Sequence, residues 1–89
     1  MAGMVGMNVE EVRNLSRHMD SVATQIEQAA RQITSLMSST TWVGNDRTAF
    51  EGDWTGQHMT AISHVVTAVR QAGQVAGRNA DDQEQVANG

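Results

Sequence analysis

The stretch Thr40-Thr41-Trp42-Val43-Gly44-Asn45-Asp46 decides the fold, because it interrupts a chain that is periodic on both sides. It sets a large aromatic beside residues typical of turns. Gly44 tolerates a positive φ, and Asn45 and Asp46 can hydrogen-bond nearby backbone amides. Helical periodicity stops before this stretch and resumes after it. The sequence therefore predicts a helix, a tight turn over residues 39–45 that carries Trp42, and a second helix running back antiparallel to the first.

The first helix is predicted over residues 8–38. Asn8 is a candidate N-cap, and Glu11 three positions later completes a capping-box pattern. A run of serines and threonines at 38–41, which compete for backbone hydrogen bonds, ends the helix. Apolar residues recur at alternating spacings of three and four, as in the a/d seam of a coiled coil. This seam comprises Val12, Leu15, Met19, Val22, Ile26, Ala29, Ile33 and Leu36.

The second helix, predicted over residues 46–78, has a wider apolar stripe. Ile62, Val66 and Val69 run beside its main seam, so the stripe is wider than one partner helix would cover. We expect two hairpins to pair into an antiparallel four-helix bundle, with both seams at the interface. The seam of the second helix consists of Phe50, Trp54, Ala61, Val65, Ala68, Ala72 and Val75, with polar Gln57 or His58 at one position.

Glycines in the second helix have two explanations. Gly73 and Gly77 each cost a helix roughly 1 kcal/mol relative to alanine. Either the backbones approach closely there, or this end of the helix is frayed; the pattern does not choose between them. From Asn79 the chain turns acidic and polar, and we expect a flexible tail over residues 79–89.

Length and composition exclude several kinds of site and partner. Eighty-nine residues form one domain over 1–89, and two helices alone bury little, so a partner is expected. The chain has no Cys, which excludes disulfides and thiolate metal sites. The net charge of -4 offers no clustered positive surface, so no nucleic-acid partner is expected. No segment approaches the roughly 18 apolar residues of a membrane span, so no stable membrane insertion is expected.

Candidate catalytic and metal-binding groups do not converge. His58 and His64 are six residues apart, or about 120° around a helix, and His18 is on the other helix. Glu51 and Asp53 point about 160° apart, so they do not form a working pair of carboxylates. We therefore expect no enzyme, no metal site and no cofactor.

One family matches this arrangement. Trp42-Val43-Gly44 in the turn of a hairpin of this length, followed by Phe50 and Trp54, resembles the Trp-Xaa-Gly family of small early-secreted-antigen-like proteins. These are substrates of type VII secretion in mycobacteria, other actinobacteria and related Gram-positive bacteria. Segments 70–73 and 78–85 are also similar to the end of the culture-filtrate members of that family. The resemblance covers essentially the whole chain.

The resemblance implies a four-helix bundle of two hairpins, formed with itself or with a sister chain, and exported folded by a membrane ATPase-driven machine. It also implies that Trp42 and Gly44 form a recognition turn, which lies near the C-terminal end of the partner and makes a composite export signal with it. The chain would then be a secreted substrate or co-secretion partner, cytoplasmic before export. Residues 1–7 lack the basic segment and sustained apolar run of a signal peptide, so export without a cleavable leader is expected.

The chain departs from the family pattern at one point. The C-terminal half of the family signal is usually Tyr-Xaa-Xaa-Xaa-Asp or Glu, and this chain has no Tyr. Gly77 stands four residues before Asp81, and Arg78 four before Asp82. Three alternatives follow: a partner supplies the tyrosine, another tail residue serves, or the chain is a small helper that escorts a larger secreted protein such as a toxin. A hypothesis from a different class is a non-secreted helical adaptor or assembly module.

Overall fold

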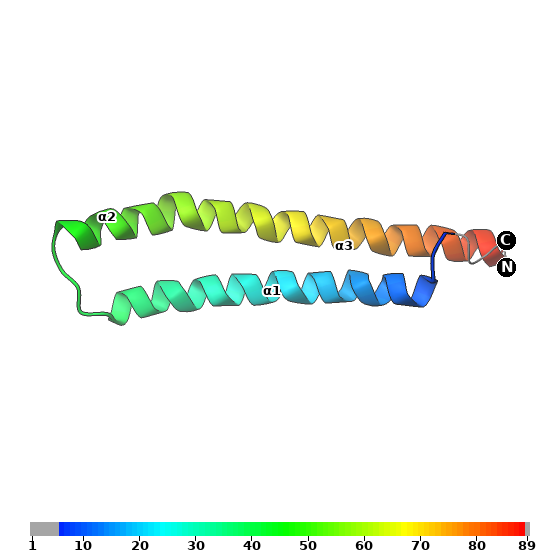
Figure 1. The fold of residues 1–89 in the computed structure, drawn as a ribbon, viewed down its shortest axis with the longest axis horizontal. Helices are drawn as coiled ribbons and strands as arrows, with labels where there is room; N and C mark the ends of the chain where they lie inside the picture. The colour runs from blue at the N-terminus through cyan, green and yellow to red at the C-terminus, as the bar shows by residue number, and fades with distance from the viewer. Residues whose placement is uncertain (1–5, 89) are drawn as a thin grey trace.

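The chain forms a slender helical hairpin. The structure, a computed structural model, describes residues 6–88; residues 1–5, and residue 89 at the end of the predicted tail, lie outside the described part. Two long helical segments lie side by side and antiparallel, joined by one short loop (Figure 1). The molecule measures 66 × 18 × 15 Å, and its radius of gyration is 19.8 Å. A globular chain of this length would have about 12 Å, so the predicted hairpin is confirmed as a rod.

The first helix, α1, spans Val9–Ser39. Its start confirms the predicted cap, because the Asn8 side-chain oxygen accepts a hydrogen bond from the Glu11 backbone N–H at 3.1 Å. At its other end the Thr40 hydroxyl donates to the Leu36 carbonyl at 2.5 Å. The Thr40 backbone N–H donates to the Met37 carbonyl at 3.3 Å. The hydroxyl and backbone N–H of Thr40 thus satisfy two of the last carbonyls of the helix, within the serine and threonine run that was predicted to end it.

The second segment consists of α2 (Asn45–Asp53), a five-residue π-helix η2 (Trp54–His58) and α3 (Met59–Asn88). The expected flexible tail is wrong for the described residues, because α3 continues to Asn88. Two contacts with the start of α1 explain this. Arg13 pairs with Asp81 at 2.8 Å and with Glu84 at 3.0 Å, so the acidic end of α3 is held against its neighbour.

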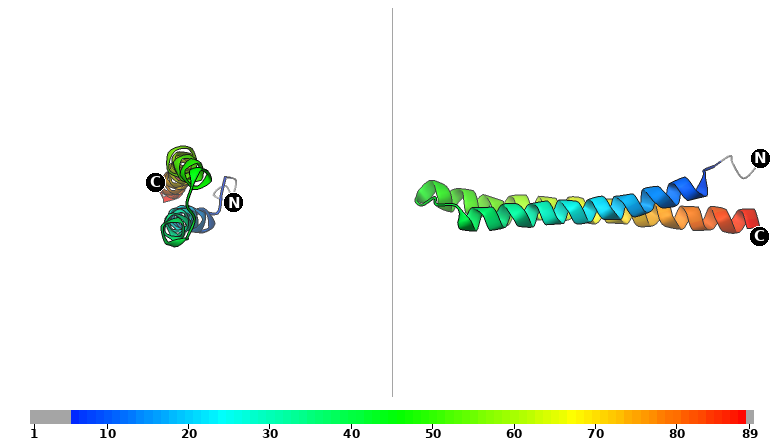
Figure 2. Two further views of the ribbon diagram at one scale, coloured as in Figure 1. Left: turned by 90° about the vertical axis from the view of Figure 1, so that its left-hand side faces the viewer. Right: turned by 90° about the horizontal axis from the view of Figure 1, so that it is seen from below.

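The two helices meet along a line of small and medium side chains. Ala23 and Ala30 on α1 and Val66 and Ala80 on α3 are buried, and α1 and α3 pack along their lengths, as the two views in Figure 2 show. Because each helix has only the other as neighbour, burial marks where they touch. This contact line consists of half-buried or buried Val12, Ser16, Met19, Ala23, Ile26, Ala30, Thr34 and Met37 on α1, and Met59, Ile62, Val66, Val69, Gly73, Ala76 and Ala80 on α3.

Gly73 and Gly77 mark a close approach of the two backbones. The Ser16 hydroxyl donates a hydrogen bond to the Gly73 carbonyl at 2.6 Å. A Cβ at Gly73 would lie 3.1 Å from the Ser16 carbonyl oxygen and 3.3 Å from the Met19 Cβ. A Cβ at Gly77 would lie 3.0 Å from the Ser16 hydroxyl oxygen. Of the two explanations for these glycines, close approach is confirmed and fraying is wrong.

The π-helix η2 shifts the phase of α3 by one residue. Trp54 and Met59 both lie half-buried against α1, five positions apart, and the Met59 backbone N–H donates to the Trp54 carbonyl, which is the i→i+5 bond of a π-turn. A regular α-helix extended from Trp54 would instead turn Ala61, Val65, Ala68 and Ala72 toward α1. All four are exposed, and the residue after each lies on the contact line.

Candidate interaction surfaces

The loop that joins the helices carries an exposed aromatic cluster at one end of the rod. The Trp42 and Phe50 rings are tilted by 51°, with centroids 5.3 Å apart, a favourable aromatic geometry. Trp42 is 39% exposed and Val43 87%. Gly44, which follows, has a φ of 114°, a conformation that favours glycine. The turn therefore presents Trp42 and Val43 to solvent from a fixed backbone.

Arg47 fixes this turn. Its guanidinium donates to the Trp42 carbonyl at 2.8 Å and to the Thr40 carbonyl at 3.4 Å. The same group binds the Glu51 carboxylate through two nitrogens, at 2.8 and 3.0 Å. This role of Arg47 was not predicted from the sequence, although the i,i+4 spacing of Arg47 and Glu51 was the available signal.

Ion pairs define one long face of the hairpin. Besides the Arg13 cluster, Arg70 contacts Glu27 at 2.9 Å and Asp20 at 3.5 Å. Apart from Glu84, these charged residues stand one position after a contact-line residue on both helices. In an antiparallel pair such positions share one side of the ribbon. We call this side the polar face; its members are Arg13, Arg17, Asp20, Thr24, Glu27 and Arg31 on α1 and Thr60, Ser63, Thr67, Arg70, Gln74 and Asp81 on α3.

These ion pairs shift the ionisation of their members. Hydrogen bonding to the Arg13 guanidinium holds the pKa of the Glu84 carboxyl below its ordinary value. Hydrogen bonding to Arg70 lowers the pKa of Glu27 in the same way. Reciprocally, Glu84 raises the pKa of Arg13, and Glu27 raises that of Arg70. Both carboxylates therefore stay charged into acid, and both link α1 to α3.

The opposite long face is mostly apolar, with polar Glu11, His18, Gln25, His58 and Asn79 at the remaining equivalent positions. Residues one position before the contact line occupy it, and they include large exposed side chains: Leu36 is 64% exposed and Val65 50%. We call it the apolar face. Its members are Leu15, Val22, Ala29, Ile33 and Leu36 on α1 and Ala61, Val65, Ala68, Ala72 and Val75 on α3.

The predicted interface residues divide among three places. Val12, Met19, Ile26 and Trp54 lie on the contact line within the hairpin. Phe50 lies at the exposed tip beside Trp42. The remaining members, Leu15, Val22, Ile33, Leu36, Ala61, Val65, Ala68 and Ala72, lie on the apolar face.

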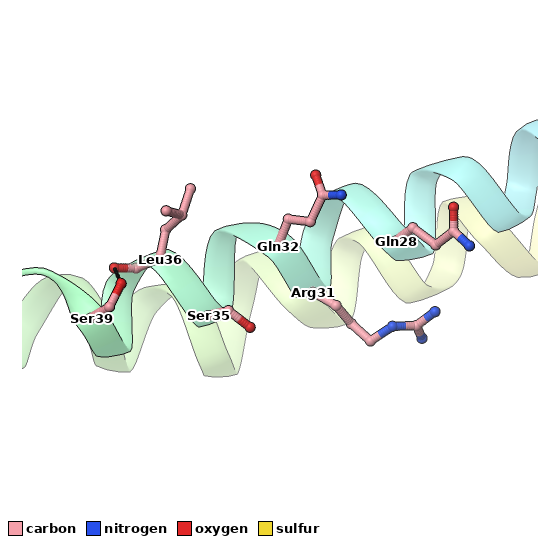
Figure 3. Close-up of a pocket in the computed structure, with 6 residues that line it drawn as sticks. All are labelled: Gln28, Arg31, Gln32, Ser35, Leu36 and Ser39. Carbon is pink, nitrogen blue, oxygen red and sulfur yellow. Dashed lines mark hydrogen bonds between the residues drawn. The ribbon is translucent and has the colours of Figure 1, made fainter.

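One hollow on the surface lies along a single helix. The depression in Figure 3 is lined by six exposed residues that all come from α1, among them Arg31 and Leu36. Because one helix supplies the whole lining, the depression is open. In residues 6–88, no three His, Asp or Glu side chains gather closely enough to hold a metal ion. No helix in the described part of the chain is both long enough and apolar enough to cross a membrane.

Comparison with known proteins adds no relative: no protein-family model, no curated protein and no solved structure matches this chain.

Proposed function

We propose that this chain is a secreted substrate or co-secretion partner of a type VII secretion system, and that it acts through helical pairing and a Trp-Xaa-Gly recognition turn. One observation supports this most directly. The tripeptide Trp42-Val43-Gly44 forms the turn between two long antiparallel helices, where it is exposed and braced by Arg47. A secretion machine that reads this motif would find it at the tip of a rod, free of the helix packing.

The apolar face supports pairing into a four-helix bundle. The chain exposes 6369 Å², whereas a globular monomer of 9.6 kDa exposes roughly 5,100 Å². The excess, about 1,300 Å², exceeds the ~800 Å² that each partner contributes to a standard interface. A second hairpin laid on the apolar face would cover side chains such as Leu36 and Val65. We propose that this partner is a second copy or a sister chain.

The missing tyrosine bears on the choice of partner. Gly77, four residues before Asp81, packs on Ser16, so a tyrosine ring at that position would not fit between helices this close. Asp81 itself pairs with Arg13. Arg78 and Asp82 are both exposed. We propose that the tyrosine comes from a sister chain, with the exposed tail residues or escort of a larger cargo as the alternatives.

Export of Trp42 variants tests the proposal. The chain would be expressed in a host with an active type VII system, and the culture filtrate and cell lysate compared by immunoblot. We expect Trp42→Ala to abolish export while the purified chain keeps its helicity and mass in solution. Val43→Ala is the matched control, because it removes a more exposed side chain from the same turn, and it should be exported normally.

The same experiment distinguishes the secretion proposal from its alternative, a non-secreted adaptor or assembly module. That function gives Trp42 no role beyond its contact with Phe50. If the unaltered chain stays in the cells, or if Trp42→Ala is exported as well as the unaltered chain, the secretion proposal is wrong.

A further inference from the structure

Two sets of residues on α3 could face α1, and each member of one set comes one position before a member of the other. The π-helix η2 determines which set faces α1. With η2 present, Met59, Ile62, Val66, Val69 and Gly73 face α1. If the five residues of η2 became α-helical while Trp54 stayed in place, each contact position would pass to the residue before it. The seam would then be His58, Ala61, Val65, Ala68 and Ala72, which also has the heptad spacing.

The same shift would change what the apolar face offers to a partner. Its positions on α3 are now filled by Ala61, Val65, Ala68, Ala72 and Val75. In the shifted register these residues would turn toward α1. Thr60, His64, Thr67, Gln71 and Gln74 would take their places, and all five are polar. The π-turn therefore determines whether α3 shows an apolar or a polar stripe on this side.

We propose that η2 is a register switch, and that the chain has a second, all-α register, shifted by one residue, that hides the apolar stripe of α3. The observed register is favoured by contacts that the shift would remove. Val69 would replace Arg70 opposite Glu27, Gln83 would replace Glu84 opposite Arg13, and Asn79 would replace buried Ala80. Glycines stand at 52, just before the π-turn, and at 56, within it. A Cβ added at either would meet no atom within 4 Å, so no side-chain contact at these positions locks the π-turn.

The hydrogen bond from the Trp54 indole to the Thr34 hydroxyl, at 2.9 Å, gives the switch a fixed point. Trp54 is held against α1 on the loop side of η2, and Gly73 against Ser16 on the other side. Between Trp54 and Gly73 the chain has one residue more than a regular α-helix needs to reach both contacts, and a π-turn accommodates that extra residue. Releasing the contact at Gly73 would let α3 rotate and the excess disappear.

Engineered cysteines distinguish the two registers, because the chain has none of its own. The Gly77 Cβ position is 3.8 Å from the Ser16 Cβ, the usual spacing across a disulfide. The pair Ser16→Cys with Gly77→Cys therefore reports the observed register. In the shifted register residue 76 takes the place of residue 77, so Ser16→Cys with Ala76→Cys reports that one. Both pairs lose the Ser16 bond to Gly73 alike, so the ion pairs of Arg13 and Arg70 are what favour the observed register in this background. Closure within one chain is read by intact mass and non-reducing gel.

Gly73→Leu is the perturbation, since its side chain would collide with Ser16 and Met19 in the observed register but would point to solvent in the shifted one. We expect it to move closure from the 16/77 pair to the 16/76 pair, changing the ratio of the two rates by about tenfold or more, as overpacking of a close contact implies. Helicity should be retained. If the 16/77 pair still closes faster, or if helicity is lost and neither pair closes, there is no second register.

Deletion of Gln57 is the control, because it removes the extra residue and makes the observed register fully α-helical. Alone, the deletion should leave closure of the 16/77 pair intact. Combined with Gly73→Leu it should lower the thermal midpoint and leave the 16/76 pair open; closure of that pair would contradict the role of η2. The idea that the shifted register hides the apolar stripe of α3 from a partner rests on the proposed pairing. It has its own test: the mass of the Gly73→Leu chain in solution should fall. A dimer that persists with 16/76 closed would refute this idea alone.

Discussion

At the scale of single residues, the hairpin depends on places where side chains are absent. Ser16 donates to the Gly73 carbonyl where the backbones approach so closely that a Cβ at Gly73 would lie 3.1 Å from the Ser16 carbonyl oxygen and 3.3 Å from the Met19 Cβ. The backbone approach therefore favours glycine at 73 and not at 52, where an added Cβ meets nothing within 4 Å. The same residue type thus has opposite energetic roles in one helical segment.

Alanine substitutions should show this difference. Gly73→Ala should lower the free energy of unfolding by about 1–3 kcal/mol through overpacking. Gly52→Ala should raise it by roughly 0.5–1 kcal/mol, since alanine is the better helix former. Urea unfolding followed by circular dichroism measures both. Equal effects at the two positions would mean that the close approach at Gly73 is absent in solution.

The ion pairs on the polar face predict a dependence on acid. The pKa values of Glu84 and Glu27 are lower in the folded chain than their ordinary value of 4.5, so their stabilisation is complete above that value and is lost as the pH falls through the folded pKa. Arg13→Met removes the Glu84 contribution. We expect the urea midpoint of this variant to fall less on acidification than that of the unaltered chain; an identical fall would show that the pair contributes nothing.

At the scale of elements, α2 and α3 are separate units joined by η2, and Trp54 anchors the joint through its bond to Thr34. Thr34→Val keeps the side-chain shape and removes the acceptor. We expect about 1 kcal/mol lower stability and a change in Trp54 fluorescence, read in a Trp42→Phe background. Thr55→Val, whose hydroxyl bonds only the Glu51 carbonyl of its own segment, is the control. If Thr34→Val and Thr55→Val had equal effects, the Trp54–Thr34 hydrogen bond would not be what anchors η2.

The sequence predicted the bounds of α1 well, because its cap and its terminating hydroxyl residues are local signals. Its seam was divided by the structure: Val12, Met19 and Ile26 lie on the contact line, whereas Leu15, Val22, Ile33 and Leu36 lie on the apolar face. The second segment was predicted less well beyond Trp54. The prediction ran one heptad pattern through Gln57 and His58. The lack of an apolar residue at these positions was the available sign that the side of the helix facing α1 shifts by one residue there. The helical end of α3 was missed because Arg13 and Glu84 are 71 positions apart, and no local pattern shows such a pair. The polar and apolar faces followed only once the register was known.

At the scale of the whole molecule, two neighbouring valines lie on different surfaces, one within the hairpin and one on the proposed interface with a partner. Val66 is 3% exposed on the contact line, and Val65 is 50% exposed on the apolar face. Val66→Glu should unfold the hairpin, because an unpaired buried charge costs several kcal/mol. Val65→Glu should prevent pairing, and its helicity should match that of the unaltered chain at dilutions where that chain is also a monomer. Circular dichroism and light scattering on both variants measure this; retained association in Val65→Glu would exclude the apolar face as the interface.

The most direct test of the pairing surface is the mass of the purified chain in solution, measured by light scattering together with its helicity over a dilution series. We predict that helicity and association fall together on dilution, since the apolar face needs a partner. Where the partner is a second copy, the undiluted chain is a helical dimer of about twice the 9.6 kDa chain mass. A poorly helical monomer at every concentration would agree with a separate sister chain. A monomer that keeps full helicity at high dilution would contradict the central claim, because the apolar face would then need no partner.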